Sequence, residues 1–329
     1  MTFNARVARI AATGGPEVIE WHDQLFDGEP ANDEVLVRHT AVGVNFIDTY
    51  HRTGVYPLQL PSGIGVEAAG VIEWLGEGVH GFAVGDRVAY FSAQPGSYAT
   101  HRLIGTSTMV KIPDGIDDRT AAASLLKGCT AEYLIERCGR VEAGETVLVH
   151  AAAGGMGLLL TQWLKAIGAR VIGTTSSEAK AELARAHGCD EIILYAEEAV
   201  APRVRELTGG EGVRLVIDGV GKATWEESLG SLRRRGLLIS YGNASGTVGG
   251  VDLGILARKG SLFTTRPTLF DYYATREEVE AGTARLFAMI ASGALKVRID
   301  QSYPLEEAAR AHADLEGRAT TGSSILLPP

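Results

Sequence analysis

Residues 146–168 read TVLVHAAAGGMGLLLTQWLKAIG, and this stretch decides the fold class. It opens with a short apolar run typical of a buried strand, and residues 158–167 have the length and apolar content of a helix that the final glycine ends. The loop between them matches the pattern G-x-G-x-x-G at Gly154 and Gly157, with Ala152 in place of the first glycine. A strand, a glycine loop and a helix in this order predict a dinucleotide site, although α/β proteins without a bound nucleotide also contain such turns.

The same alternation of strands and helices continues downstream of the loop. Predicted strands lie at 170–174, 191–195, 215–218 and 237–241, and predicted helices lie at 178–187, 198–207 and 224–232. Short apolar strands that alternate with helices are typical of a parallel sheet. We therefore predict a Rossmann-type, doubly wound α/β domain over residues 128–266.

The segments before residue 128 and after residue 266 have a different sequence pattern. Short apolar runs at 35–38, 71–75 and 87–91, bounded by Gly, Pro and Asp, predict the antiparallel strands of a compact β-rich barrel. The tail contains two amphipathic patterns, at 276–293 and 305–316, and is too small to fold alone. We expect the tail to return to the barrel, so that residues 1–127 and 267–329 form one domain into which residues 128–266 are inserted.

Composition excludes several classes of protein. With 329 residues, 45% of them hydrophobic, the chain is neither disordered nor fibrous. A net charge of −9 argues against a nucleic-acid partner and against an anionic membrane surface.

Cysteine usage and hydropathy predict a location. Cys129, Cys138 and Cys189 are too few for a disulfide framework or a cysteine metal site, which suits a reducing compartment. The start MTFNAR lacks the apolar segment of a signal peptide, and polar residues interrupt the apolar stretch 147–164. We expect a cytoplasmic protein with no membrane span.

The end of the second Rossmann strand predicts the type of coenzyme. Sites selective for NAD place Asp or Glu about 20 residues beyond the first glycine. This chain has the sequence GTTSS at 173–177, without an acid, and its small hydroxyl side chains leave room for a 2′-phosphate. Lys180 follows and supplies a positive charge, although it is also explained as a solvated surface lysine. We predict NADPH as the coenzyme.

The layout resembles the medium-chain dehydrogenase/reductase superfamily. The stretch PSGIGVEAAG at 61–70 is similar to its G-x-E-x-x-G signature, and GDRV at 85–88 is similar to its G-D-R-V turn. Zinc alcohol dehydrogenases of that superfamily carry Cys where Asn45 stands and His where Val66 stands. An amide and an isopropyl group do not replace these ligands, so no metal site is expected.

Within the superfamily, the chain resembles the zinc-free quinone oxidoreductases of the zeta-crystallin type over nearly its full length. The similar motifs are NFIDTY at 45–50, LKGCT at 126–130, AAAGGMG at 151–157, SYGN at 240–243, TRP at 265–267 and RATTGSS at 318–324. The resemblance implies a GroES-like barrel domain, a Rossmann domain that binds NADPH, a small quinone as substrate, and a homodimer joined around residues 240–265.

The resemblance also implies the site residues. Asn45, Tyr50 and Lys127 are the expected catalytic residues beside the nicotinamide and the quinone, and they also contact the coenzyme. The other expected coenzyme contacts are Thr130, Ala153, Gly154, Gly155, Met156, Gly157, Gly173, Thr174, Ser177, Lys180, Tyr195, Tyr241, Gly242, Asn243, Thr264, Thr265, Arg266 and Arg318.

The expected reaction is hydride or single-electron transfer from the nicotinamide to a quinone held in the cleft between the domains. It needs orientation and donors for the developing oxyanion, which Asn45, Tyr50 or Lys127 would supply. Two alternatives stay open. One is an NADPH-dependent reductase of α,β-unsaturated carbonyls, with Tyr50 as the proton donor. The other is a cofactor-binding protein with a structural or RNA-binding role.

Some polar residues have a structural interpretation instead. His51, His101 and His150 lack paired metal spacing and are predicted to lie at the surface or in turns. Asp218, at a strand end, is predicted to accept hydrogen bonds from its own turn.

Overall fold

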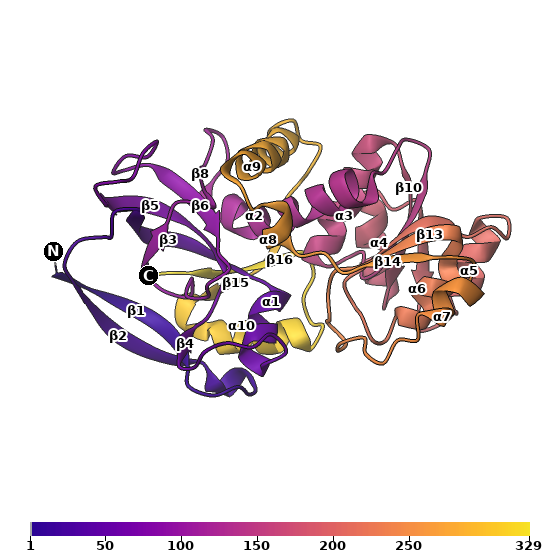
Figure 1. Ribbon diagram of the computed structural model, residues 1–329, viewed down its shortest axis with the longest axis horizontal. Helices are drawn as coiled ribbons and strands as arrows, with labels where there is room; N and C mark the ends of the chain where they lie inside the picture. Colours follow the sequence, from indigo (N-terminus) through magenta and orange to yellow (C-terminus); the bar gives the residue numbers. More distant parts are fainter. Residues whose placement is uncertain (1) are drawn as a thin grey trace. The chain divides into compact units, whose positions relative to one another are not determined.

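The computed structural model describes residues 2–329, and its chain divides into two compact units (Figure 1). The first unit contains the chain up to Cys129 together with Tyr273–Ala291 and Val297–Pro329, and the second contains Thr130–Tyr272 and Ser292–Lys296. Met1, which the predicted first domain includes, lies outside the described residues. The domain boundaries predicted from the sequence, at 127/128 and 266/267, stay a prediction.

The second unit is built on a six-stranded parallel sheet. In spatial order its strands are β11 (Glu191–Leu194), β10 (Arg170–Thr175), β9 (Thr146–Val149), β12 (Val213–Asp218), β13 (Leu232–Ser240) and β14 (Phe263–Thr265). The direction in which strands are added reverses between β9 and β12, which is where doubly wound sheets bind ligands. The predicted Rossmann-type sheet is confirmed.

Helices connect these strands and cover the sheet. They are α3 (Gly155–Ile167), α4 (Glu178–Ala186), α5 (Val200–Leu207) and α6 (Trp225–Ser231), followed by the unpredicted short helices α7 (Gly254–Arg258) and α8 (Leu269–Tyr272). Helices α3 and α4 pack against β9, β10 and β11, whereas α5 packs against α6, which contacts β12 and β13. The chain enters the unit through α2 (Asp118–Glu132), which continues into a π-helical segment, η2 (Tyr133–Gly139).

The first unit contains two sheets. A seven-stranded sheet has the order β15 (Ile299–Pro304), β16 (Ser323–Leu327), β3 (Glu34–Val44), β5 (Glu67–Leu75), β6 (Arg87–Phe91) and β8 (Met109–Lys111), with β7 (His101–Gly105) also paired to β3. A three-stranded sheet has the order β2 (Glu20–Asp27), β1 (Thr2–Ile10) and β4 (Ser62–Gly63). The tail returns as expected, because β16 pairs with β3. The pair β15 and β16 is parallel, unlike the predicted all-antiparallel barrel.

The first unit also contains most of α2, together with the helices α1 (Phe46–Thr53), α9 (Arg276–Ala291) and α10 (Ala308–Glu316). The short 3-10 segments are η1 (Pro16–Val18) and η3 (Leu305–Glu307), so the helix expected over 305–316 is divided between η3 and α10. Helix α1 was not predicted from the sequence. Within residues 2–329, no helix is long and apolar enough to cross a membrane.

Candidate active site

Nearly all the coenzyme residues predicted in the second unit lie at the carboxyl-terminal edge of its parallel sheet. The glycine loop follows β9, Gly173 and Thr174 lie in the second half of β10, and Tyr195 follows β11. Residues 241–243 follow β13, Thr264 and Thr265 end β14, and Arg266 follows β14. We call this set of segments the coenzyme edge. Thr130 belongs to α2. Ligands of open α/β sheets bind at this edge, so the predicted residues converge where such a fold binds its coenzyme.

The glycine loop leads directly into α3, with Gly154 as the residue before the first helical turn. A Cβ atom at Gly157 would lie 2.3 Å from the carbonyl oxygen of Ala151, so this position allows the helix to pack closely on the loop. A Cβ at Gly154 would meet only that same oxygen, at 3.4 Å. The first backbone N–H groups of α3 have no partner within the helix and are suited to bind an anion.

The ends of β10 and β11 form the next part of the coenzyme edge. Thr175 of β10 is in register with Leu194 of β11, and the Tyr195 N–H donates to the Thr175 carbonyl at 3.2 Å. Ser177 precedes α4, and Lys180 lies in the first turn of this helix. No acidic side chain lies between residues 173 and 177. The segment therefore fits a phosphate on the ribose better than an unmodified 2′-hydroxyl.

The far end of the coenzyme edge is held by β13 and β14. Thr264 and Thr265 of β14 pair with Leu238 and Ile239 of β13. The guanidinium Nη1 of Arg266 donates to the Ser240 carbonyl at 2.7 Å. This bond ties the residue after β14 to the last residue of β13, just before residues 241–243.

In the first unit, the buried carboxylate of Glu67 joins Asn45 and Lys127. From the sequence, Glu67 was only one residue of the motif at 61–70. The Asn45 amide Nδ2 donates to Glu67 Oε2 at 2.8 Å, and the Lys127 Nζ lies 3.9 Å from the same oxygen. Lys127 also donates to the Val44 carbonyl at 3.2 Å, and Glu67 Oε1 accepts from the Leu126 N–H at 2.6 Å. We call Asn45, Glu67 and Lys127 the Glu67 cluster.

Burial controls the charges of the Glu67 cluster. Glu67 is fully buried, which raises its pKa, while Lys127 and the hydrogen bond from Asn45 act in the opposite direction. Burial likewise lowers the pKa of Lys127, with Glu67 and Asp48 opposing this shift. A Cβ at Gly43 would lie 2.3 Å from Glu67 Oε2, so only glycine leaves room for this carboxylate. The cluster thus presents an amide and a cation beside each other, the donors that a developing oxyanion requires.

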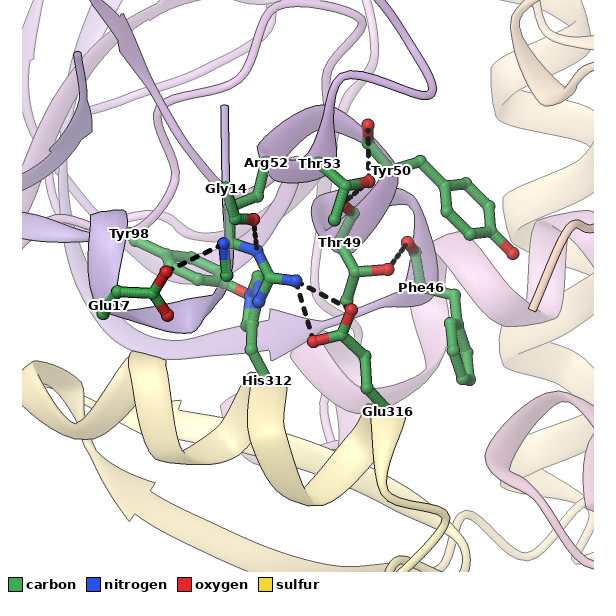
Figure 2. Close-up of polar contacts among 11 residues, drawn as sticks. Gly14, Glu17, Phe46, Thr49, Tyr50, Arg52, Thr53, Tyr98, His312 and Glu316 are labelled. Atoms are coloured by element: carbon green, nitrogen blue, oxygen red, sulfur yellow. Dashed lines mark hydrogen bonds and ion pairs between the residues drawn. The ribbon is translucent and has the colours of Figure 1, made fainter. Parts of the chain in front are cut away.

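Helix α1 has an aromatic face, which carries Phe46 and Tyr50, and an opposite face, which carries Arg52. Figure 2 shows the rings of Phe46 and Tyr50 on the side opposite to Arg52. Tyr50 is buried, and its ring packs edge-on against Tyr56 with centroids 5.2 Å apart. Arg52 is also buried, and its Nη2 donates to both carboxylate oxygens of Glu316 of α10, at 2.7 and 2.8 Å (Figure 2). The ion pair fixes one face of α1, and the aromatic face carries Tyr50.

A buried hydrogen-bond chain holds the start of α1. The Arg52 Nη1 lies 3.4 Å from His312 Nδ1, and His312 Nε2 lies 2.9 Å from the Tyr98 hydroxyl (Figure 2). Tyr98 donates to Asp48 Oδ2 at 3.0 Å, and the same oxygen accepts from the Asn45 N–H at 2.8 Å. Asp48 thereby connects this chain to Asn45 of the Glu67 cluster.

The buried acids and histidines of the first unit make its stability depend on pH. Burial raises the pKa of Asp48 from 3.8 to about 7, so the folded protein keeps a proton that the unfolded chain loses, and stability falls as the pH rises through this window. Burial lowers the pKa of His39 and of His312 from 6.5 to about 3, so these residues act oppositely, and stability falls as the pH drops below 6.5.

The Asp48→Asn substitution removes the first of these opposing contributions. We expect its free energy of unfolding to decrease more steeply than that of the wild type on acidification from pH 6.5 to 5, by about 1.4 kcal/mol per pH unit. Urea denaturation of both proteins at these two pH values measures the difference. Equal pH dependence in the two proteins would show that Asp48 does not hold a proton in the folded state.

Some sequence predictions about polar residues need correction. His51, expected at the surface or in a turn, is buried within helix α1. His150 lies in a turn as predicted, but it is buried, whereas His101 is partly exposed on β7. His150 is accommodated because Thr174 and Ser228 lie within hydrogen-bond distance of its two ring nitrogens. The prediction for Asp218 is confirmed, since its Oδ1 accepts from the N–H groups of residues 220 and 221 at 2.8 and 3.1 Å.

The predicted site residue Arg318 is exposed at the surface, and several buried polar residues were not predicted. Arg318 is exposed after α10, in the first unit. No role was predicted from the sequence for Asp48, Glu67, Tyr98 or His312. The sequence carries a signal for Glu67, because a charged residue within the apolar run IGVEAA is expected to be paired.

A groove of about 790 Å³ lies elsewhere on the first unit, along α9. Phe82, Lys111, Arg276 and Phe287 contribute to its lining, but none of the predicted site residues does. Its two cations are engaged, Lys111 with Asp86 and Arg276 with Glu280, both at 2.8 Å. The groove is therefore separate from the candidate active site.

Comparisons with known proteins agree with this architecture. A family model described as zinc-binding dehydrogenase matches residues 155–286, and one described as alcohol dehydrogenase GroES-like domain matches residues 31–136. The chain is 51% identical to a quinone oxidoreductase of Pseudomonas aeruginosa over 98% of its own length and 100% of the relative. The chain belongs to the quinone oxidoreductase family. The resemblance to this family and the GroES-like and Rossmann-type fold class predicted from the sequence are confirmed.

Solved structures of this family and its neighbours show how far the likeness extends. A crystal structure of Escherichia coli quinone oxidoreductase complexed with NADPH superposes with a TM-score of 0.96 at 47% identity, covering 98% of this chain and 100% of that one. A 2-haloacrylate reductase from a Burkholderia species is 44% identical over 98% of each chain. In this quinone oxidoreductase family member, residues 2–329 contain no group of three or more His, Cys, Asp or Glu side chains that could hold a metal ion.

Proposed function

We propose that this chain is a zinc-independent, NADPH-dependent reductase of small quinones. The full-length likeness to quinone oxidoreductases, including one solved with NADPH, carries the proposal. The coenzyme edge fits NADPH, because Gly154 leaves space for a pyrophosphate at the start of α3 and no acid opposes a 2′-phosphate. When bound, NADPH supplies the hydride.

The chain's own residues would bind, orient and stabilise charge. Residues 153–157 would bind the pyrophosphate, and Ser177, Lys180 and Tyr195 would surround the 2′-phosphate and adenosine. The Lys127 ammonium and the Asn45 amide of the Glu67 cluster would stabilise the negative charge that develops on the quinone oxygen. Tyr50 would line the quinone site with its aromatic ring. Hydride transfer would leave a hydroquinone monoanion, which would take its one remaining proton from water.

The first test follows NADPH consumption by the purified protein with benzoquinone, a larger ortho-quinone and an enone, each with a metal chelator present. We expect turnover of the quinones that survives chelation, and much slower turnover with NADH. Loss of turnover on chelation would contradict the zinc-independent site, and NADPH binding without any turnover would favour a non-catalytic role.

A second candidate activity is reduction of the double bond of α,β-unsaturated carbonyls. The 44% identity to a 2-haloacrylate reductase supports it. This reaction needs a proton donor to the α-carbon, and Tyr50 is the candidate. Exclusive turnover of the enone in the same assay, abolished by Tyr50→Phe, would favour this activity over quinone reduction.

The Lys180→Ala substitution tests the 2′-phosphate assignment. We expect the KM for NADPH to rise about tenfold and the KM for NADH to stay unchanged, because only NADPH carries the phosphate that the lysine would bind. The matched control is Lys165→Ala, since Lys165 lies in the last turn of α3, paired with Asp190, and away from the coenzyme edge. Steady-state kinetics measure the effect, and equal changes for both coenzymes would contradict the assignment.

We also propose that two copies associate through β14 in the cytoplasm. Strand β14 is an edge of its sheet, and Phe263 on it is 60% exposed, which is a combination that association would cover. The cytoplasmic location is supported by the low number of cysteines, which suits a reducing compartment. Light scattering should give twice the chain mass of 34.8 kDa, and Phe263→Asp should give the mass of a monomer. A monomeric wild-type protein would contradict the dimer.

A further inference from the structure

A chain of buried polar groups lies directly beneath the coenzyme edge. His150 Nδ1 lies 3.1 Å from Thr174 Oγ1, which accepts from the Ala151 N–H at 3.3 Å. His150 Nε2 lies 3.0 Å from Ser228 Oγ, and Ser228 donates to Asp218 Oδ2 at 2.7 Å. All four side chains are at most 2% exposed. We call His150, Thr174, Ser228 and Asp218 the His150 chain.

The chemistry of the end group fixes the direction of every bond in the His150 chain. A carboxylate only accepts, so the Ser228 hydroxyl donates to Asp218 and accepts from His150 Nε2–H. Neutral imidazole has one N–H, which leaves Nδ1 as the acceptor for the Thr174 hydroxyl. Burial lowers the pKa of His150, although Asp218 and Glu227 oppose this shift, which agrees with a neutral ring. The ring is therefore the Nε2–H tautomer.

The His150 chain joins three segments of the coenzyme edge that are distant in sequence. His150 and Ala151 begin the glycine loop, and Thr174 is the residue before the last of β10. At the other end, the backbone carbonyl of Asp218 accepts from the Tyr241 N–H at 2.9 Å, at the start of residues 241–243. Helix α6 contributes Ser228 as the bridge between the two strand ends.

We propose that His150, Ser228 and Asp218 are positioning residues that hold the glycine loop, the end of β10 and residues 241–243 in the arrangement that binds NADPH. They act through the residues that contact the coenzyme and do not touch it themselves. The inference rests on the proposed NADPH-dependent function, and no motif of the sequence assigns this role to them.

Removing the Ser228 hydroxyl should weaken coenzyme binding and leave the quinone step intact. The Ser228→Ala substitution leaves His150 Nε2–H buried without an acceptor, which removes the bond that fixes the ring and its tautomer. We expect the Kd and KM for NADPH to rise about tenfold. The kcat at saturating NADPH and the KM for the quinone should change less than about twofold.

The same helix provides a matched control. Ser231 is also a fully buried serine of α6, but its hydroxyl donates only to the Glu227 carbonyl within the helix, at 2.7 Å. Ser231→Ala therefore reproduces the loss of a buried hydroxyl without touching the His150 chain, and its NADPH affinity should equal that of the wild type. If Ser228→Ala does not fold, the isosteric Ser228→Cys variant, whose thiol bonds more weakly, gives the same comparison.

Titration calorimetry with NADPH and nitrogen NMR of protein labelled at histidine test the inference. We expect the tautomer with hydrogen on Nε2 for His150 in the wild type, and weaker NADPH binding in Ser228→Ala alone. Equal affinities of the two alanine variants, or a His150 with hydrogen on Nδ1, would overturn the inference while the wild type still binds NADPH. A wild-type protein that does not bind NADPH would overturn the proposed function and the inference together.

Discussion

Replacing Lys127 by methionine will lower the free energy of unfolding by about 3–5 kcal/mol. Glu67 is fully buried and ion-paired with Lys127, whose side chain is 11% exposed. The substitution leaves a carboxylate that retains one donor from Asn45 and one from the Leu126 backbone but has lost its only nearby cation among the described contacts. Desolvation of an unpaired charge is among the largest penalties that a single substitution produces.

The control and the compensating variant separate this cause from simple loss of a lysine. Lys111→Met breaks an ion pair of the same unit, with Asp86 at 2.8 Å, but its lysine side chain is 54% exposed, so a change below about 1 kcal/mol is expected. The double variant Glu67→Gln with Lys127→Met removes both charges and should recover most of the lost stability.

Activity should not follow stability in this series. If Lys127 stabilises the oxyanion as proposed, the double variant will be stable but will turn over quinones about 100-fold more slowly than the wild type. Chemical denaturation and quinone turnover measure the two quantities. Recovery of activity together with stability would show that Lys127 has a structural role only.

The parallel sheet of the second unit was predictable because its strands are buried on both faces. Such strands appear in the sequence as continuous apolar runs, and the glycine loop supplies a local motif at the first of them. Strand β14 was not predicted, because Phe263–Thr265 is too short to give a pattern. Once the strands are known, the fold class predicts that the residues at their carboxyl ends converge on one edge of the sheet.

Helix α1 shows why part of the site was not predictable. Its eight residues include the β-branched Ile47, Thr49 and Thr53, which disfavour a helix. The only local signal is the pair Asn45 and Asp48, which is typical of a helix start. What fixes the helix lies far along the chain, in Tyr98, His312 and Glu316, and no periodicity links those positions.

The Glu67 cluster and the His150 chain share this property. Glu67 and Lys127 are 60 positions apart in sequence, and His150 and Ser228 are 78 apart. Their pairing depends on tertiary packing, so a single sequence indicates at most that a charge or a histidine stands within an apolar run. Motifs identify the groups that contact the coenzyme, whereas the groups that hold them in place become visible only in the structure.

Two glycines of the loop should respond differently to alanine, because they have different neighbours. At Gly157 the new Cβ would lie 2.3 Å from the Ala151 carbonyl oxygen and 2.7 Å from backbone atoms of Ala152, so the loop or α3 must move. We expect Gly157→Ala to lose about 2–3 kcal/mol of stability and to bind NADPH at least about 100-fold more weakly.

Gly154→Ala should keep the fold and lose the ligand. Gly154 has a φ of −77° and a ψ of 167°, which alanine adopts readily, and its Cβ would meet only the Ala151 oxygen at 3.4 Å. We expect a stability change below about 1 kcal/mol, together with NADPH binding about tenfold weaker or worse, because the methyl group occupies the approach of the pyrophosphate. Thermal unfolding without ligand and calorimetry with NADPH measure both effects. If Gly154→Ala bound NADPH as tightly as the wild type, the pyrophosphate would not lie against this residue, and the proposed position of the coenzyme on the loop would be wrong.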